Sequence, residues 1–297
     1  MIARTCILVL LALLSCQKKP EATPFCSVGS SEMNSLMDNW NRLYTASGGE
    51  HLQHEGRGNG VAHLALASQA CFFAAVSRKL TNPEIQRIVQ KTGQEVVHIP
   101  VGLDAIALIT RSDHKATSIA PETVFQIYHE GASASPFSTA YRINTASERY
   151  QFFKAVAVKD QAIADTVLEV PDTVRAVEAV IRTGGIAFVR PADVVAGVRI
   201  LALEMDFHRP VLPDERSVVS GLYPYTRHLY LVLPAQLPQH EDASQVLRFV
   251  ELTLSEEGQK VLLPLGFFPL DGASRHSSRN LLAELKKKQQ QGNGRDG

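Results

Sequence analysis

The chain has 297 residues, of which 30 are basic and 30 are acidic, so its formal net charge is zero. This length is enough for one large or two medium domains with hydrophobic cores. Nucleic acid is an unsuitable partner, because the chain has no excess of basic residues to replace the counterions of a polyanion.

The first 15 residues have the pattern of a secretory signal peptide. Arg4 precedes an apolar run that is too short to span a bilayer as a mature helix, and small residues precede Cys16. The stretch Leu13-Leu14-Ser15-Cys16 resembles the bacterial lipobox, which implies cleavage before Cys16 and diacylation of its thiol. We therefore expect a signal peptide at 1–15 and a lipoprotein tether at 16–23. The alternative is an ordinary signal peptide that is cut further on.

A lipid anchor would hold the domain at a membrane surface, in the cell envelope and facing the periplasm, without a spanning helix. Gln17 follows Cys16, so the Asp associated with retention at the inner membrane is missing. In a cell that has an outer membrane, we therefore expect the anchor there. Removal of residues 1–15 takes away Arg4 alone and leaves a net charge of −1.

Apolar runs alternate with amphipathic stretches in the first part of the chain. Apolar residues at helical spacing predict a first helix at 31–44, which Ser30 or Ser31 would cap and where Glu32 would suit the helix dipole. Strands are expected at 25–28, 51–55, 71–75, 95–99 and 103–110, and further helices from about 61 and at 82–91. This alternation predicts a mostly parallel sheet that helices cover on both faces.

The same alternation continues to the end of the chain. Helices are expected at 121–129, 147–158 and 171–182, strands at 185–189 and 198–203, and a turn followed by a strand within 221–234. A long helix is expected at 243–263, with an interruption near Gly258. Residues 286–297 are polar, and we expect them to form a disordered tail.

Two cysteines remain once Cys6 leaves with the signal and Cys16 takes lipid. Cys26 lies in the first expected strand and Cys71 in the third, so a disulfide requires these strands to be neighbours. An oxidising compartment favours the bond, and two separate buried thiols are the alternative.

Six short motifs, each weak alone, follow one another along the chain. They are Gly29-Ser30-Ser31-Glu32, Gly58-Asn59-Gly60, Val76-Ser77-Arg78, Arg142-Ile143-Asn144-Thr145-Ala146-Ser147-Glu148, the stretch 223–230 with Tyr-Pro and Arg-His-Leu-Tyr, and the stretch 254–270 with Glu-Gly-Gln and Gly-Phe-Phe-Pro-Leu. This series resembles the substrate-binding proteins of ABC phosphate transporters, from about Pro24 to Leu270. The resemblance implies an α/β, two-lobed, periplasmic-binding-protein-like fold with a ligand cleft between the lobes. Lobe 1 would be formed by 24–105 and 225–285, and lobe 2 by 106–224.

The resemblance also implies which residues face the ligand. They are Ser30, Ser31, Glu32, Asn59, Ser77, Arg78, Arg142, Ala146, Ser147 and Glu148. In the family, helix N-termini, hydroxyl groups and one Arg hold phosphate through many short hydrogen bonds, and Arg142 matches that Arg.

Five of these positions depart from the family pattern. Glu32 and Glu148 replace Thr, Asn59 and Ala146 replace Ser, and Ser147 replaces Gly. An ionised carboxylate beside a divalent anion costs on the order of several kcal/mol at intermediate dielectric, and it cannot donate the lost hydrogen bond. We therefore expect phosphate binding to be weakened. Alternatively, both glutamates turn outward and pair with nearby arginines, namely Arg57, Arg78, Arg142 or Arg149.

The sequence predicts a non-catalytic, monomeric solute-binding protein that takes a small anionic solute, either phosphate or another oxyanion, and needs no cofactor. A partner ABC permease is implied by the resemblance alone, and an outer-membrane anchor would weaken that implication. The alternative is an envelope sensing or protein-interaction module that has lost phosphate binding.

Catalytic and metal sites find little support in the sequence. It lacks a Gly-x-Ser-x-Gly elbow, a His-Glu-x-x-His motif and a phosphate loop, so no catalytic residue is proposed. A hydrolase is a further alternative, because a catalytic triad is assembled in space. His51 and His54 would point to opposite faces of a strand, so we expect no metal site there.

Overall fold

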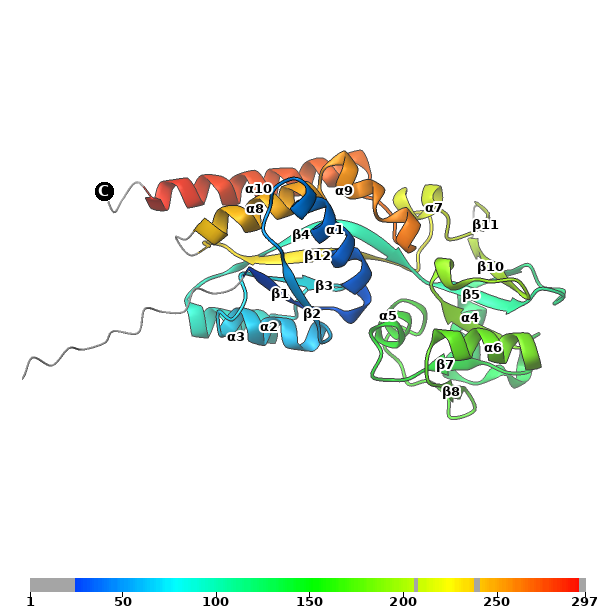
Figure 1. Cartoon of the computed structure of the whole chain (residues 1–297). Coiled ribbons are helices and arrows are strands. Elements are labelled where there is room, and N and C mark those ends of the chain that lie inside the picture. Colours follow the sequence, from blue (N-terminus) through cyan, green and yellow to red (C-terminus); the bar gives the residue numbers. More distant parts are fainter. Residues whose placement is uncertain (1–24, 206–207, 238–240, 294–297) are drawn as a thin grey trace, which may run out of the picture.

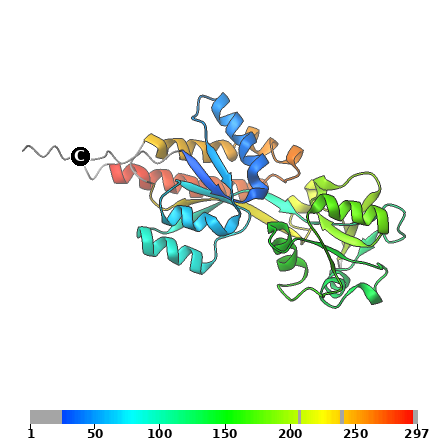
Figure 2. The same ribbon diagram turned by 60° about the horizontal axis from the view of Figure 1, so that its bottom comes forward.

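The computed structural model describes residues 25–205, 208–237 and 241–293. The expected signal peptide at 1–15 and the expected tether at 16–23, with the lipidation site Cys16, lie outside these residues. Figure 1 and Figure 2 show two lobes that are joined by extended strands. Within the described residues, every helix is too short or too polar to cross a membrane.

Lobe 1 is built around a five-stranded sheet. Its strands lie in the order β2 (Gln53–Gly56), β1 (Cys26–Gly29), β3 (Phe73–Val76), β12 (Thr226–Pro234) and β4 (Val96–Ala105). Strand β1 runs parallel to β2 and β3, whereas β12 runs antiparallel to β3 and β4.

Helices cover both faces of this sheet, as Figure 1 shows. One face carries α1 (Asn34–Ala46), α8 (Glu241–Thr253), α9 (Glu256–Lys260) and α10 (Gly272–Asn293), and the other carries α2 (Asn59–Ala67) and α3 (Asn82–Thr92). A short 3-10 turn, η1 (Ser31–Met33), precedes α1, and another, η4 (Leu263–Leu265), follows α9. The apolar stripe of α1 is buried against the sheet, and the indole of Trp40 donates to the carbonyl of Gly258 at 2.8 Å.

Lobe 2 has a second five-stranded sheet, which is mainly antiparallel. Four of its strands lie in the order β11 (His208–Val211), β10 (Val198–Met205), β5 (Ala107–Arg111) and β9 (Ile186–Val189). The fifth strand, β6 (Ser118–Ile119), pairs in parallel with β10. A separate parallel pair is formed by β7 (Tyr141–Ile143) and β8 (Leu168–Val170). Its helices are α4 (Pro121–His129), α5 (Glu148–Ala157), α6 (Thr173–Thr183) and α7 (Glu215–Val219), with 3-10 turns η2 (Ala132–Ala134) and η3 (Pro191–Asp193).

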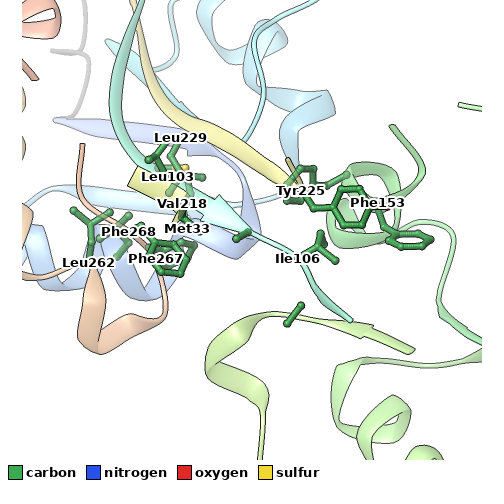
Figure 3. Close-up of a cluster of buried hydrophobic side chains, with 14 of the residues drawn as sticks. Met33, Leu103, Ile106, Phe153, Val218, Tyr225, Leu229, Leu262, Phe267 and Phe268 are labelled. Carbon is green, nitrogen blue, oxygen red and sulfur yellow. The ribbon is translucent and has the colours of Figure 1, made fainter. Parts of the chain in front are cut away.

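The chain crosses between the lobes at two places that are hydrogen-bonded to each other. Ile106 separates β4 from β5, and its N–H donates to the carbonyl of Tyr225, just before β12, at 3.0 Å. The hydroxyl of Tyr223 donates to the carbonyl of Ile106 at 2.7 Å. Figure 3 shows Ile106 and Tyr225 in a row of buried side chains that runs from Leu103 in lobe 1 to Phe153 in lobe 2.

Strand directions differ from the expected mostly parallel sheets. Among the named strands of the described residues, the parallel pairs are β1 with β2 and β3, β6 with β10, and β7 with β8. The reason lies in the crossings, because β4 leaves lobe 1 and β12 returns beside it, which makes the two strands antiparallel. The other expected elements are present with ends shifted by a few residues.

Two expected strands, 95–99 and 103–110, are instead the single strand β4 followed by β5. Pro100 lies within β4 and is tolerated because β4 is the edge strand and the register shifts at this point. The Ser278 hydroxyl of α10 donates to the carbonyl of Pro100 at 2.8 Å, which covers the exposed side of the strand.

The expected helix break at Gly258 is also misplaced. Helix α8 ends at Thr253, and α9 starts after Ser255. The Ser255 hydroxyl caps α9 by accepting a hydrogen bond from the Gly258 N–H at 3.0 Å. Gly258 lies inside α9, where a Cβ would meet the carbonyl oxygen of Leu252 at 2.0 Å. This glycine permits close helix packing and does not interrupt a helix.

The expectation of a disordered tail from residue 286 is wrong as far as Asn293, because α10 continues to that residue. Leu282 and Leu285 are buried, and Lys286 pairs with Glu251 of α8 at 2.8 Å. Lys and Gln are good helix formers, so packing of one face is enough to extend the helix.

Cys26 of β1 and Cys71, just before β3, are joined by a disulfide, with their Cα atoms 5.1 Å apart. The two strands are neighbours in the sheet, as this bond requires. Of the two states that the sequence left open, the structure has the bonded one.

Candidate functional site in the inter-lobe cleft

The candidate site lies between the lobes and starts from two hydrogen-bond donors of lobe 1. The buried Ser30, between β1 and η1, donates its hydroxyl to Oε2 of Glu148 at 2.5 Å. Asn59, the first residue of α2, donates its backbone N–H to Oε1 of Glu148 at 2.5 Å. We call the Ser30 hydroxyl and the Asn59 N–H the anion nest, because converging donors at helix starts suit an anion.

Gly58 and Ser77 hold the Asn59 part of the nest in position. Gly58 has a φ of 92°, in the left-handed region that glycine adopts without strain. The Asn59 side chain accepts from the Ser77 N–H and donates to the Ser77 hydroxyl, both at 2.8 Å. Asn59 therefore presents its backbone to the cleft, while its side chain fixes the start of α2 within lobe 1.

Glu148 is the first residue of α5 in lobe 2, and its side chain reaches lobe 1 across the cleft. The preceding Ser147 is the helix cap, whose hydroxyl accepts from the Tyr150 N–H at 3.0 Å. Each oxygen of the Glu148 carboxylate accepts one hydrogen bond from the anion nest. A carboxylate of the chain itself therefore occupies the position that suits an anionic ligand.

Four charged residues beside the nest form what we call the inter-lobe ion cluster. Arg149 of α5 donates to both oxygens of Asp104 of β4, at 3.0 and 2.9 Å, and its Nη2 lies 3.2 Å from Glu32 of η1. Arg227 of β12 also pairs with Asp104, at 2.8 Å, and with Glu32. Asp104 and Arg149 are almost completely buried. Two cations and two anions therefore balance one another across the cleft.

Asp104 remains ionised despite its burial. Burial by itself raises its pKa, but the attraction of Arg149 and Arg227, together with their hydrogen bonds, outweighs burial and holds the pKa below its usual value. The register of the sheet places Asp104 directly opposite Arg227. The Arg227 guanidinium also stacks on the ring of Phe152 at 4.3 Å, which fixes it beside α5.

Some residues that the sequence singled out for the site lie apart from the nest. Arg142 pairs with Glu169 of β8 and lies over the ring of Tyr150 at 5.8 Å, within lobe 2. Arg78 makes a bidentate pair with Glu84 at 2.8 Å, and this hydrogen bonding raises the pKa of Arg78. Ser31 is exposed at the start of η1.

A cavity of about 660 Å³ opens beside the nest and is lined by both lobes. Its cationic residues are Arg57, Arg78, Lys79 and Arg227, and Glu148 is its carboxylate. Ala146 and Phe152 of lobe 2 line it as well. Burial lowers the pKa of His228, another lining residue, which favours its neutral form. The cavity is therefore mainly cationic, with apolar and aromatic walls.

Sequence reasoning missed Asp104 and Arg227 as residues of the cleft, whereas Arg149 was among the arginines named as partners for the glutamates and does pair with Glu32. The signal for Arg227 was its place in the 223–230 motif, and the signal for Asp104 was a carboxylate inside an apolar strand. Among the described residues, no group of three or more His, Cys, Asp or Glu could hold a metal ion.

Three comparisons with known proteins fit this arrangement. A family profile described as a PBP superfamily domain matches residues 17–257. The chain belongs to this superfamily. The relatives to which it is similar within this superfamily include phosphate-binding proteins. The phosphate-binding protein PstS of Pseudomonas aeruginosa is 26% identical over 269 residues, which cover 82% of each chain.

Solved structures of phosphate-binding proteins share the fold with this chain at low sequence identity. An ABC-type phosphate transport receptor from Vibrio cholerae has a TM-score of 0.67 at 18% identity and covers 82% of this chain and 99% of its own. A putative phosphate ABC transporter substrate-binding protein from Clostridium perfringens, solved with bound phosphate, has a TM-score of 0.64 at 15% identity. It covers 83% of this chain and 99% of its own. These similarities support the two-lobed α/β fold.

Proposed function

We propose that this protein is a lipid-anchored, extracytoplasmic and non-catalytic receptor that takes a small anionic solute in the cleft between its lobes. One observation carries the proposal: two donors of lobe 1, the Ser30 hydroxyl and the Asn59 N–H, converge on a carboxylate group in the cleft. Converging donors of this kind, fixed by a helix start, are a general means of holding anions without a metal.

The charges around the nest support an anionic solute. Arg57, Arg78, Lys79 and Arg227 line the adjoining cavity, where Arg57, Arg78 and Arg227 also pair with Glu55, Glu84 and Asp104. A cleft lined mainly by one sign of charge raises the local concentration of counter-ions. Phosphate or another oxyanion is the solute class that the similarity to phosphate-binding proteins supports.

The proposal includes the surroundings that the family suggests. An ABC permease is the expected partner, and a diacylated Cys16 would hold the receptor at the envelope, on the outer membrane where the cell has one. The receptor would act as a monomer. The Ser30 hydroxyl is hydrogen-bonded to Glu148, and the Ser77 hydroxyl is hydrogen-bonded to Asn59. Neither partner is the histidine base that activates a serine nucleophile, so these contacts support a binding role for the two hydroxyls.

A titration of the purified full chain with phosphate, sulfate and small carboxylates tests the proposal. We expect at least one anion to raise the melting temperature and to give a saturable heat of binding. Ser30→Ala removes a nest donor and should weaken that anion at least tenfold. The matched control is Ser35→Ala, an exposed serine of α1, which should bind like the wild type. If no anion stabilises the wild type, the receptor proposal fails.

A second function is favoured by the same carboxylate. Because Glu148 already fills the nest, the domain could serve as an envelope sensing or protein-interaction module that has lost phosphate binding. The titration separates the two functions, because a module of this kind would bind neither phosphate nor the other anions.

A further inference from the structure

Two consecutive residues at the start of α5 join lobe 2 to lobe 1. Glu148 brings a negative charge to the anion nest, and Arg149 brings a positive charge to the carboxylates of the inter-lobe ion cluster. Figures 1 and 2 both show α5 on the side of lobe 2 that faces lobe 1. Both contacts are made by groups of the chain itself, and they join the two lobes.

We infer that Glu148 is a tethered anion that occupies the solute position, holds the lobes closed and must be displaced before a free anion binds. This inference rests on the proposed function, since it assigns the nest to the solute. The nest has one hydroxyl hydrogen and one N–H hydrogen, and Glu148 uses both at 2.5 Å. A free anion therefore finds no unused donor there. It also meets the charge of the carboxylate.

Tethering gives Glu148 an advantage over any dissolved competitor. A group held on the same chain acts at an effective concentration of about millimolar or more, and a rigid helix directs it better than a flexible linker does. A solute present below that concentration must therefore bind the nest more tightly than a carboxylate in order to replace it. The affinity for free phosphate is lowered accordingly.

Glu148 determines the choice of solute, and Glu32 does not. Both stand where the family has Thr, but Glu32 pairs with Arg149 and Arg227 and so adds little unbalanced charge to the cleft. Arg142, which matches the phosphate-pairing Arg of the family, pairs with Glu169 within lobe 2. Lobe 2 therefore offers a carboxylate to the nest, and Arg142 is turned away from it.

The test compares wild type, Glu148→Thr and Glu148→Gln in the full chain, by phosphate titration and by distances between spin labels. The labels sit at exposed positions of the two lobes, Gln86 of α3 and Val174 of α6, after Cys6 and Cys16 are replaced by Ser. Glu148→Gln keeps the shape of the side chain and removes its charge. Glu148→Thr restores the family residue and is too short to reach the nest.

We expect wild type to give one label distance that phosphate leaves unchanged. Glu148→Thr should add a population with a longer distance in the absence of solute, and it should bind phosphate at least tenfold more tightly than wild type. Glu148→Gln should show a long-distance population and a phosphate affinity that are both intermediate between those of wild type and Glu148→Thr. The matched control is Glu215→Gln, an exposed first-turn glutamate of α7, which should behave like wild type. Far-UV circular dichroism shows that each variant is folded.

Each other outcome has a separate meaning. If Glu148→Thr and Glu148→Gln leave both the distances and the phosphate affinity at wild-type values, the inference is overturned, even when the wild type binds an anion as proposed. If the variants open but neither they nor the wild type bind any anion, the tether stands and the receptor proposal fails. Phosphate binding by wild type as tight as that by Glu148→Thr also overturns the inference.

Discussion

Replacement of Asp104 by Asn should destabilise the protein strongly, because it removes one charge from a buried network. The amide keeps the shape of the side chain but leaves Arg149, which is 2% exposed, without its main counter-ion. Removing one partner of a buried ion pair costs about 3–5 kcal/mol of stability. Arg149 and Arg227 keep their pairing with Glu32, so we expect a cost at the lower end of that range. At about 2–4 °C per kcal/mol, a loss of about 3 kcal/mol lowers the melting temperature by about 6–12 °C.

The pH dependence of this effect follows from the lowered pKa of Asp104. The unfolded carboxyl has a pKa of 3.8, and the folded one lies lower because Arg149 and Arg227 outweigh the effect of burial. The folded state therefore binds this proton less readily than the unfolded chain does. The stabilisation is complete above the unfolded pKa and is lost as the pH falls through the folded pKa. The gap in melting temperature between wild type and Asp104→Asn should therefore narrow in acid.

Thermal unfolding followed by circular dichroism, near neutral pH and again near the folded pKa, measures both effects. The matched control is Asp113→Asn, which breaks an ion pair with Arg111 whose side chains are 67% and 46% exposed. This variant should melt like wild type, because water screens an exposed pair. A melting temperature for Asp104→Asn as close to wild type as that of Asp113→Asn would refute the reasoning, as would a gap that does not change with pH.

Three further changes are expected to act through single contacts. Reduction of the Cys26–Cys71 bond, which spans 45 residues, should lower the free energy of unfolding by about 4 kcal/mol in the chain-entropy limit, and denaturant unfolding with and without a thiol reductant measures this. His98 accepts from the Leu80 N–H, and burial lowers its pKa, so its contribution to stability should be complete above pH 6.5 and fall as the pH drops further. His98→Ala should flatten the stability profile in that range. Gly258→Ala should cost about 1–3 kcal/mol by urea unfolding, because its Cβ would meet a backbone carbonyl of α8 at 2.0 Å.

Local patterns predicted most of the elements because they depend on residues close in sequence. The spacing of apolar residues placed α1, and Pro121 at the first turn marked the start of α4. The direction of β12 depends instead on where the chain re-enters lobe 1, and no local pattern of residues encodes that. The extent of α10 likewise depends on packing against α8 and β4, which burial of Leu282 and Leu285 reveals only in the folded chain.

The candidate site divides in the same way. Motifs located Ser30, Asn59 and Ser77, because each stands at a helix start or strand end, where local geometry exposes donors. The direction of the Glu148 side chain could not be predicted, since its partners on the other lobe lie 89 and 118 residues away in sequence. Arg142 shows the converse, because a residue that matches a family motif pairs with Glu169 in its own lobe.

The pair Glu148–Arg149 is best explained by its partners across the cleft. At a helix N-terminus the dipole favours an anion and disfavours a cation, so Glu148 suits this position and Arg149 does not. The full charge of Asp104, whose Oδ2 lies 2.9 Å from Nη1 of Arg149, outweighs the partial charge of the helix end, and burial strengthens that attraction. Arg149 therefore stabilises contact between the lobes at a small cost to its own helix. Because the two residues are adjacent on one rigid helix, each positions the other. Weakening the Arg149–Asp104 contact should also loosen Glu148 in the anion nest, so Asp104→Asn is expected to raise the affinity for phosphate while it lowers stability.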